Sequence, residues 1–435
     1  MTEPARPAPS FRQALRFWTL LGFVNFGGPT GQIAIMHDEL VERRRWIDEE
    51  RFLHALSFCT LLPGPEAQQL AIYVGWLLHG LRGGLVAGTL FVLPAAVLIL
   101  ALAWTYAAHG SLDLVTSVFA GLSAAVVGIV AAATLTIAPR AIRAPLGVAI
   151  AIGAFLTIWL AVVPFPLVVL AAGLAGLAAG PDRLGVPEDA TPVQAGPRPA
   201  TGRTVATVAI GLAVWWLPLL AVAAATGVTS IYSREGVFFS QAAMVTFGGA
   251  YAVLAFVGRE VVARFGLTTG DVVAGLGLAE TTPGPLILVV EFLGFLAAYR
   301  EPGDLSPVVA GAIGAAVTLW ATFVPSFVWI FAGAPYMERL RANHRLRGLL
   351  AGITASVVGV IAGLAVSIGT VVLFDRTVIV RPFGGDVTLP VLGTIDPLAA
   401  TLAVGAFVAM RRFKVHVVWI VVAAASVGLA AGLLR

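Results

Sequence analysis

The sequence has few charged residues and almost no cysteine. Asp, Glu, Lys and Arg make up 11% of its 435 residues, whereas an ordinary soluble domain carries about a quarter. The single cysteine, Cys59, excludes an intrachain disulfide, a thiolate metal cluster and a redox pair within one chain. The sequence contains no GxxxxGK[ST] phosphate loop, no dinucleotide fingerprint and no histidine pair with metal-site spacing. We therefore expect no cofactor, no bound metal and no nucleotide-driven machinery.

Long apolar runs dominate the sequence instead. Hydrophobic residues make up 59% of it, and the mean hydropathy is +0.93. Runs long enough to cross a hydrocarbon core of about 30 Å recur along the whole length, so we expect an all-α polytopic membrane protein in contact with membrane lipid. The arginines stand in short clusters between these runs, which is typical of cytoplasmic loops and not of a nucleic-acid-binding surface. No small-residue cleavage motif follows the basic N-terminal segment, so we expect no cleaved leader.

The sequence is internally duplicated. The segment VNFGGPTGQIAIMHDELVER at 24–43 matches VTFGGAYAVLAFVGREVVAR at 245–264, and LLPGPEAQQLAIYVGW at 61–76 matches TTPGPLILVVEFLGF at 281–295. We call these two landmarks the FGG motif and the PGP motif. Because they recur in the same order, the sequence predicts two homologous halves.

The predicted halves span residues 11–180 and 232–435. Residues 181–231 join them and contain a Pro/Gly-rich stretch followed by an extra apolar segment at 204–226. One additional crossing between two equal halves turns the second half upside down, which predicts an inverted-topology repeat. Most basic residues then share the N-terminal side, provided that each FGG and PGP segment forms a re-entrant hairpin or a pair of short crossing helices. The positive-inside rule therefore predicts a cytoplasmic N-terminus.

Glycine and proline interrupt the apolar segments at both motifs. FGGPTG and PGPEAQQ each have the form of a break followed by a fresh helix start. At membrane depth, such breaks persist only where the backbone is buried in protein or lines a cavity, and in transporters they mark substrate sites. A new helix presents unpaired N–H groups and the positive end of its dipole toward the break, which favours an anion. We expect the breaks to converge near the membrane midplane and to offer N–H donors to an oxyanion.

Polar residues surround the breaks unequally. The first half places amide and carboxyl side chains there, at Asn25, Gln32, Glu66, Gln68 and Gln69. The second half has Thr246 and apolar residues at the matching positions and offers a different polar set, namely Glu280, Thr281, Thr282 and Glu291.

The carboxyl groups near the PGP motifs are candidates for proton coupling. Carboxyl groups within a membrane are costly and usually functional, and a medium of low dielectric constant favours their protonated form. The candidates are Glu66, Glu280 and Glu291. For Glu66 an equally weighted alternative is a helix N-cap that compensates the helix dipole.

The FGG motif, MHDELVERRRW at 36–46 and LLPGPEAQQLA at 61–71 together resemble the chromate ion transporter family. The long form of this family has two homologous domains in one bacterial inner-membrane protein. The family's motif residues fall here on Asn25, Gly27, Gly28, Pro29, Gln32, Pro63, Gly64, Pro65, Glu66, Gln68 and Gln69. The matching landmarks of the second half add further expected substrate-binding residues, namely Thr246, Gly248, Gly249, Thr281, Thr282, Pro283 and Gly284.

The resemblance implies export of chromate from the cytoplasm across the bacterial inner membrane by a secondary active transporter. A transporter or channel for sulfate or another anion is the alternative within transport. From a different class, an intramembrane enzyme would use Glu66 and Glu280 as an acid and base pair. The sequence leaves the oligomeric state open, with a homodimer as one alternative.

Overall fold

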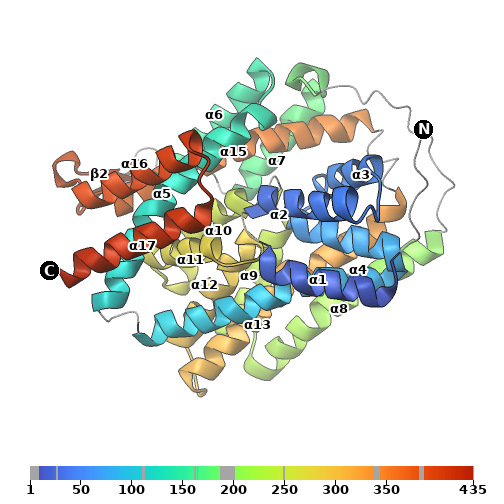
Figure 1. Cartoon of the computed structure of the whole chain (residues 1–435), viewed down its shortest axis with the longest axis horizontal. Coiled ribbons are helices and arrows are strands. Elements are labelled where there is room, and N and C mark those ends of the chain that lie inside the picture. Colours follow the sequence, from blue (N-terminus) through green and yellow to red (C-terminus); the bar gives the residue numbers. More distant parts are fainter. Residues whose placement is uncertain are drawn as a thin grey trace. The chain divides into compact units, whose positions relative to one another are not determined.

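The structure, a computed structural model, is almost entirely helical (Figure 1). It describes residues 9–25, 28–109, 113–160, 163, 165–186, 201–247, 250–336, 343–381 and 387–434. Within these ranges, five helices are long and apolar enough to cross a membrane: Glu66–His109, Thr116–Pro139, Gly202–Thr226, Pro307–Tyr336 and His344–Val372. The expected all-α polytopic architecture is confirmed.

The chain forms two compact units, and the first consists of Met1–Trp104, Ala195–Ala250 and Thr282–Glu338. Its elements are α1 (Phe11–Val24), α2 (Gly28–His37), the π-helix η1 (Asp38–Arg43), α3 (Glu49–Cys59), most of α4 (Glu66–His109), α8 (Thr201–Thr226), α9 (Ile231–Met244), η3 (Leu286–Leu288), α12 (Val289–Arg300), α13 (Pro307–Gly333) and η4 (Ala334–Tyr336).

The second unit consists of Thr105–Gln194, Tyr251–Thr281 and Arg339–Arg435. Its elements are α5 (Asp113–Ala141), α6 (Pro145–Trp159), α7 (Phe165–Ala179), η2 (Asp182–Leu184), α10 (Ala250–Phe265), α11 (Thr269–Thr281), α15 (His344–Val372), β1 (Thr377–Val380), β2 (Val387–Pro390), η6 (Leu392–Thr394), α16 (Pro397–Arg412) and α17 (Val417–Leu433). Each unit thus takes segments from both predicted halves.

Local sequence signals explain where several helices begin and bend. Ser10 caps α1 in a capping box, since its hydroxyl accepts from the N–H of Gln13 while the side chain of Gln13 accepts from the N–H of Ser10. Ser230 caps α9 in a similar way. Helix α4 bends at His79 and Gly80, where Gly80 has a φ of +62° that favours glycine.

In the second unit, helices of one predicted half pack against helices of the other. Helix α5 contacts α16 and α17, while α15 contacts α6 and α7 (Figure 1). Helices α5 and α15 occupy matching places in the two predicted halves. Each of these long helices therefore packs against the two short helices of the opposite half. The halves are therefore interlocked within this unit.

Glycines set how closely these helices approach. A β-carbon built on Gly428 of α17 would stand 3.0 Å from the Cα of Gly121 in α5. The matching contact is that of Gly352 in α15, whose β-carbon would stand 3.0 Å from the Cα of Gly176 in α7. Small residues let membrane helices approach to backbone contact, and here they do so at corresponding positions of the two halves.

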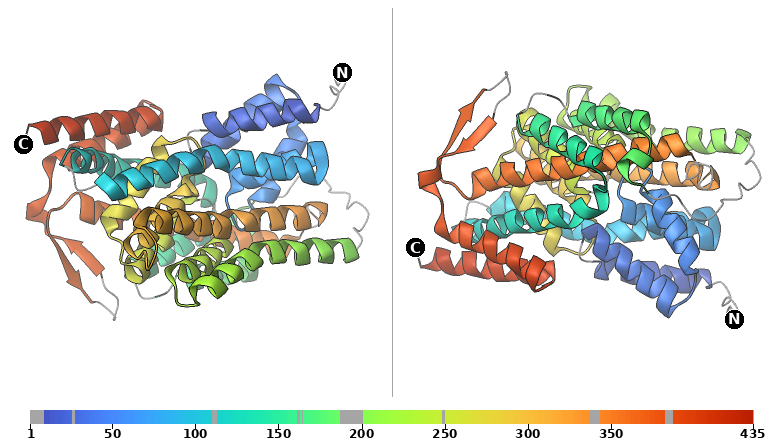
Figure 2. Two further views of the ribbon diagram at one scale, coloured as in Figure 1. Left: turned by 90° about the horizontal axis from the view of Figure 1, so that it is seen from below. Right: turned by 90° about the horizontal axis from the view of Figure 1, so that it is seen from above.

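A two-stranded antiparallel hairpin is the main departure from the expected helices in the described residues. Strand β1 pairs with β2, with Thr377 opposite Pro390 and Val380 opposite Val387. It lies in the connection between α15 and α16 (Figure 2), and β2 contacts α15. The connection between α5 and α6 in the first half is too short to hold such a hairpin.

The close contact at Gly428 yields a stability prediction. We expect Gly428→Ala to lower the free energy of unfolding by about 1–3 kcal/mol, because the added methyl meets backbone atoms that cannot move aside cheaply. The matched control is Gly405→Ala on α16, where a β-carbon meets nothing within 4 Å. Thermal unfolding of the purified protein in detergent measures both. Equal unfolding temperatures for the two variants would contradict the packing described here.

Candidate functional site

Helices end and begin on either side of each FGG and PGP motif. The first half has α1 ending at Val24 before α2, and α3 ending at Cys59 before α4; the second half has α9 ending at Met244 before α10, and α11 ending at Thr281 before η3. Three motif glycines have φ values that favour glycine: Gly28 at +63°, Gly64 at +128° and Gly284 at +116°. Gly27, Gly248 and Gly249 lie outside the described residues.

Two backbone hydrogen bonds join the motifs of opposite halves in the first unit. The N–H of Gly64, in the PGP motif of the first half, donates to the carbonyl of Thr246, 2.8 Å away, just before the FGG motif of the second half. In return, the N–H of Gly284 donates to the carbonyl of Asn25 over 2.7 Å. These residues correspond under the repeat, so the two bonds are a reciprocal pair. Each PGP motif is therefore held at the FGG motif of the other half.

A buried glutamine strengthens only one of these two junctions. The Nε2 group of Gln32 donates to the carbonyl of Gly284 over 2.5 Å and lies 3.4 Å from the carbonyl oxygen of Asn25. Val253 stands at the matching position in the second half and has no polar group to offer. The asymmetry expected from the sequence is therefore present in the contacts of the junctions.

Polar side chains also gather at Gly64, in the other junction. The Nε2 group of Gln69 donates to the carbonyl of Pro63 over 2.8 Å. A β-carbon built on Gly64 would stand 2.6 Å from this Nε2 atom and 2.8 Å from the hydroxyl oxygen of Ser326 on α13. Gln68 lies one residue away, and its Nε2 atom is 3.5 Å from the carbonyl oxygen of Gly88. The φ of +128° favours glycine at position 64, and any larger residue would have to displace Gln69 or Ser326.

Several buried polar atoms at the junctions have no hydrogen-bond partner among the described residues. Both polar atoms of the Asn25 amide are in this state, although the side chain is fully buried. So are the Oε1 atoms of three glutamines, namely Gln32, Gln68 and Gln69. A buried polar group without a partner is costly and requires an explanation, such as water or a ligand. The junctions are thus able to hold a polar ligand.

The remaining predicted residues take different positions. Thr246 is buried, and its hydroxyl donates to the carbonyl of Ala242 in the preceding helix α9, so only its carbonyl serves the junction. Thr282 is buried in the first unit, whereas Thr281 is assigned to the second. Three prolines flank the motif glycines and are partly exposed: Pro29, Pro65 and Pro283. Pro65 precedes the first residue of α4.

The three predicted carboxyl groups divide between the units. Glu66 is the first residue of α4 and is half-buried, while Glu291 on α12 is buried and its Oε2 atom has no partner among the described residues. Glu280 is buried near the end of α11 in the second unit. Glu66 and Glu291 therefore belong to the first unit and Glu280 to the second.

Sequence reasoning missed a fourth carboxyl group. Glu235 on α9 is fully buried in the first unit, and neither of its carboxyl oxygens has a hydrogen-bond partner among the described residues. The neighbouring Arg234 forms an ion pair with Glu301 over 3.5 Å. The apolar residues that follow Glu235 were the signal available.

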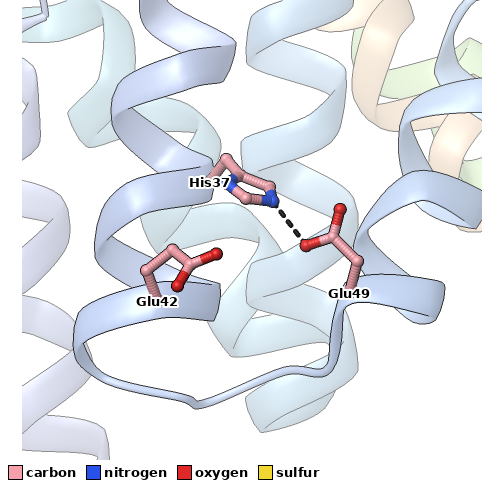
Figure 3. Close-up of side chains that lie close together, drawn as sticks. All are labelled: His37, Glu42 and Glu49. Atoms are coloured by element: carbon pink, nitrogen blue, oxygen red, sulfur yellow. Dashed lines mark hydrogen bonds and ion pairs between the residues drawn. The ribbon is translucent and has the colours of Figure 1, made fainter.

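A cluster of ionisable side chains follows the first FGG motif (Figure 3). His37, at the end of α2, and Glu49, at the start of α3, form an ion pair of 2.5 Å, and Glu42 lies beside them. Their ligand atoms all lie within 4.8 Å of one another. Glu42 and Glu49 are exposed. We therefore interpret the contact as a link between α2 and α3 and not as a metal site.

The second unit has a cavity of about 230 Å³ with one charged lining residue, Arg259. The guanidinium donates to the carbonyl of Ile158 at the end of α6. Hydroxyl groups line the same cavity, those of Thr269, Ser367 and Thr388. Guanidinium and hydroxyl groups are suited to oxyanions, so this cavity is a second place where such an anion could rest.

The two kinds of junction residue lead to opposite stability predictions. We expect Gln32→Leu to lower the free energy of unfolding by about 1–3 kcal/mol, because the carbonyl of Gly284 loses its donor. Asn25→Leu is the contrast, since it removes an amide that has no partner, and we expect unchanged or greater stability. Thermal unfolding in detergent compares them. A loss for Asn25→Leu as large as that for Gln32→Leu would show that Asn25 serves the fold.

The comparisons with known proteins agree on one family. The family model "Chromate transporter" matches the chain in two parts, residues 12–177 and 236–429. This two-part match fits a chain of two related halves, while the boundaries given above stay a prediction. No solved structure matches the chain.

Three curated relatives cover most of the chain. It is 30% identical to the "Probable chromate transport protein" of Synechococcus elongatus over 85% of this chain and 87% of the relative. It is 30% identical to the "Chromate transport protein" of Cupriavidus metallidurans, over 86% of each chain. The "Chromate transport protein" of Pseudomonas aeruginosa is 31% identical over 85% of this chain and 84% of its own. This multi-pass membrane protein therefore belongs to the chromate transporter family.

Proposed function

We propose that this protein is a secondary active transporter that exports chromate from the cytoplasm across the bacterial inner membrane. Family membership supports chromate transport and a transporter rather than an enzyme. The observation that carries the site is the reciprocal pair of backbone hydrogen bonds, which holds each PGP motif at the FGG motif of the other half. The N-terminus lies in the cytoplasm under this proposal, as the distribution of basic residues predicts.

The anion is held at the junctions by groups that donate hydrogen bonds. The starts of α2 and α4 supply the backbone N–H groups of a first helical turn and the positive ends of two helix dipoles. The unpartnered amide of Asn25 adds a side-chain donor inside the first unit. A tetrahedral dianion such as chromate or sulfate has four oxygens to satisfy, so several weak donors suit it better than one point charge.

Energy comes from an ion gradient in this proposal, with protons as the coupling ion. The sequence contains no phosphate loop for nucleotide binding. Buried carboxyl groups that gain and lose a proton are the usual relays of pumps and transporters. Glu66, Glu280 and Glu291 remain the carriers proposed from the sequence, and Glu66 stands directly at a junction, at the start of α4.

Uptake of labelled chromate into inside-out membrane vesicles tests this function. The vesicles are compared with and without an imposed pH gradient, and with excess sulfate as competitor. Saturable uptake that follows the gradient is expected. A passive anion channel would show uptake without saturation, and preferential inhibition by sulfate would move the proposal to a sulfate carrier. No uptake above that of vesicles without the protein would overturn chromate export.

The start of α2 yields a binding prediction. A β-carbon on Gly28 meets no atom of the described residues within 4 Å, and we expect Gly28→Ala to weaken chromate binding about tenfold or more by filling the place of the anion. Gly80→Ala is the matched control, because Gly80 has the same φ within a degree and the same open surroundings at the bend of α4. Equilibrium binding to purified protein measures both. Equal losses of chromate affinity in the two variants would mean that backbone strain, and not a filled binding place at Gly28, weakens binding.

The role of Glu66 is tested through pH. We expect Glu66→Gln to abolish the response of chromate flux to a pH gradient while chromate still binds, because glutamine keeps the shape of the side chain but cannot exchange a proton. Flux is measured in vesicles at matched gradients, with binding measured in parallel. A mutant whose flux follows the gradient as the unmodified protein does would restrict Glu66 to capping α4.

A further inference from the structure

A row of hydroxyl groups lies along the buried face of α13. Thr318, Thr322 and Ser326 are spaced four residues apart, which places them one above another on the helix. All three are buried, and none of their hydroxyl oxygens has a hydrogen-bond partner among the described residues. We call them the hydroxyl row.

The absence of partners sets the hydroxyl row apart from other threonines in this fold. A helical threonine normally donates to the carbonyl four residues earlier. Thr134 does so over 2.8 Å, and Thr207 and Thr401 over 2.9 and 2.7 Å. The hydroxyls of the row instead remain available to water molecules, which could join them into a chain for proton transfer.

One end of the hydroxyl row meets the buried carboxyl group of Glu235. A β-carbon built on Gly314, one turn before Thr318, would stand 3.0 Å from the Oε2 atom of Glu235. On the neighbouring helix α12, a β-carbon built on Gly294 would meet the hydroxyl oxygen of Thr318. Three residues before Glu235, the buried hydroxyl of Tyr232 also has no partner among the described residues. Glycines thus leave room beside Glu235 and Thr318.

The other end of the hydroxyl row meets a junction. The hydroxyl oxygen of Ser326 lies 2.8 Å from the place of a β-carbon on Gly64, whose N–H bonds to the carbonyl of Thr246. From Gly314 to Ser326 the helix rises about 18 Å, at 1.5 Å per residue. This is more than half of a hydrocarbon core of about 30 Å.

Glu291 lies beside the middle of the hydroxyl row. A short connection joins α12 to α13, and the contacts of Ala298 with Gly314 and of Gly294 with Thr318 show that the two helices run antiparallel. Continuing one turn past Gly294 puts Glu291 at the level of Thr322. Its unpartnered Oε2 atom is therefore a second carboxyl group within the same buried layer.

We propose that Glu235 and the hydroxyl row form a proton path that leads from the start of α9 to the junction at Gly64. Each hydroxyl accepts a proton on its oxygen and releases the one that it carried, directly or through an intervening water, so only a proton is displaced. The path rests on the proposed function for its use in coupling, but proton exchange along it is measurable without chromate.

The charged surroundings of Glu235 favour this role. Helix α13 has no charged residue, and neither has α8 beyond its first turn. Helix α12 contributes Glu291, Arg300 and its cap Glu301, while Arg234 precedes Glu235 on α9 itself. Arg234 and Glu301 pair with each other at the exposed end. With Arg234 paired to Glu301, the carboxyl group of Glu235 has no hydrogen-bonded counterion among the described residues.

Infrared spectroscopy of the intact protein tests the path without chromate. The carboxylic acid band that Glu235→Gln removes is followed after transfer to heavy water. We expect the double variant Thr318→Val, Thr322→Val to slow this exchange about tenfold or more, as expected for removing positioned proton-transfer groups. Thr134→Val is the matched control, since that hydroxyl bonds within its own helix. Thr318→Ser with Thr322→Ser should restore the rate if the hydroxyl groups act.

Two results would overturn the path: no band that depends on Glu235, or exchange that the valine pair leaves unchanged. A second measurement separates the path from the proposed function. In proteoliposomes containing a pH dye, Glu235→Gln should lose the proton movement that accompanies chromate flux. If the unmodified protein moves no protons with chromate while the valine pair still slows exchange, proton coupling fails and the path stands.

Discussion

Two reciprocal backbone hydrogen bonds hold the FGG and PGP motifs of opposite halves together in the first unit. Gly64 donates to Thr246 and Gly284 donates to Asn25, so each PGP motif is tied to the FGG motif of the other half. A glycine is required at each donor, since both have φ values in the left-handed region. Because the breaks satisfy each other, they can exist within an apolar protein without water at every backbone group. Neither half could hold its own breaks in this way alone.

The two halves contribute different chemistry to this shared frame. The first half supplies the amides of Asn25 and Gln32 and the start of α4, which suit an oxyanion. The second half supplies buried carboxyl groups and the hydroxyl row, which suit protons. A duplicated chain that keeps its paired breaks is free to diverge in this way. Under our proposals the anion and the proton meet at Gly64, where the hydroxyl row reaches the junction.

The sequence predicted the helices and their breaks because those signals are local. The extra segment at 204–226 became α8 (Thr201–Thr226), and the breaks fell at the FGG and PGP motifs. Pairing across the halves was not predictable, since the repeat pattern is the same whether Gly64 bonds within its own half or to Thr246. Glu235 was missed because it lies away from the PGP motifs, where the candidate carboxyl groups were sought. The roles of the predicted site residues stay predictions, and Asn25 is the one whose unpartnered amide most needs a ligand.

Locating bound chromate directly tests the central claim that the anion rests at the junctions of the two halves. The anomalous scattering of chromium in crystals of the protein grown with chromate gives its position without relying on transport. We predict a chromium peak at the junctions, placed so that the chromate oxygens reach hydrogen-bonding distance of the Asn25 amide or of the backbone N–H groups at the starts of α2 and α4. A peak confined to the cavity at Arg259, with none at the junctions, would contradict the account.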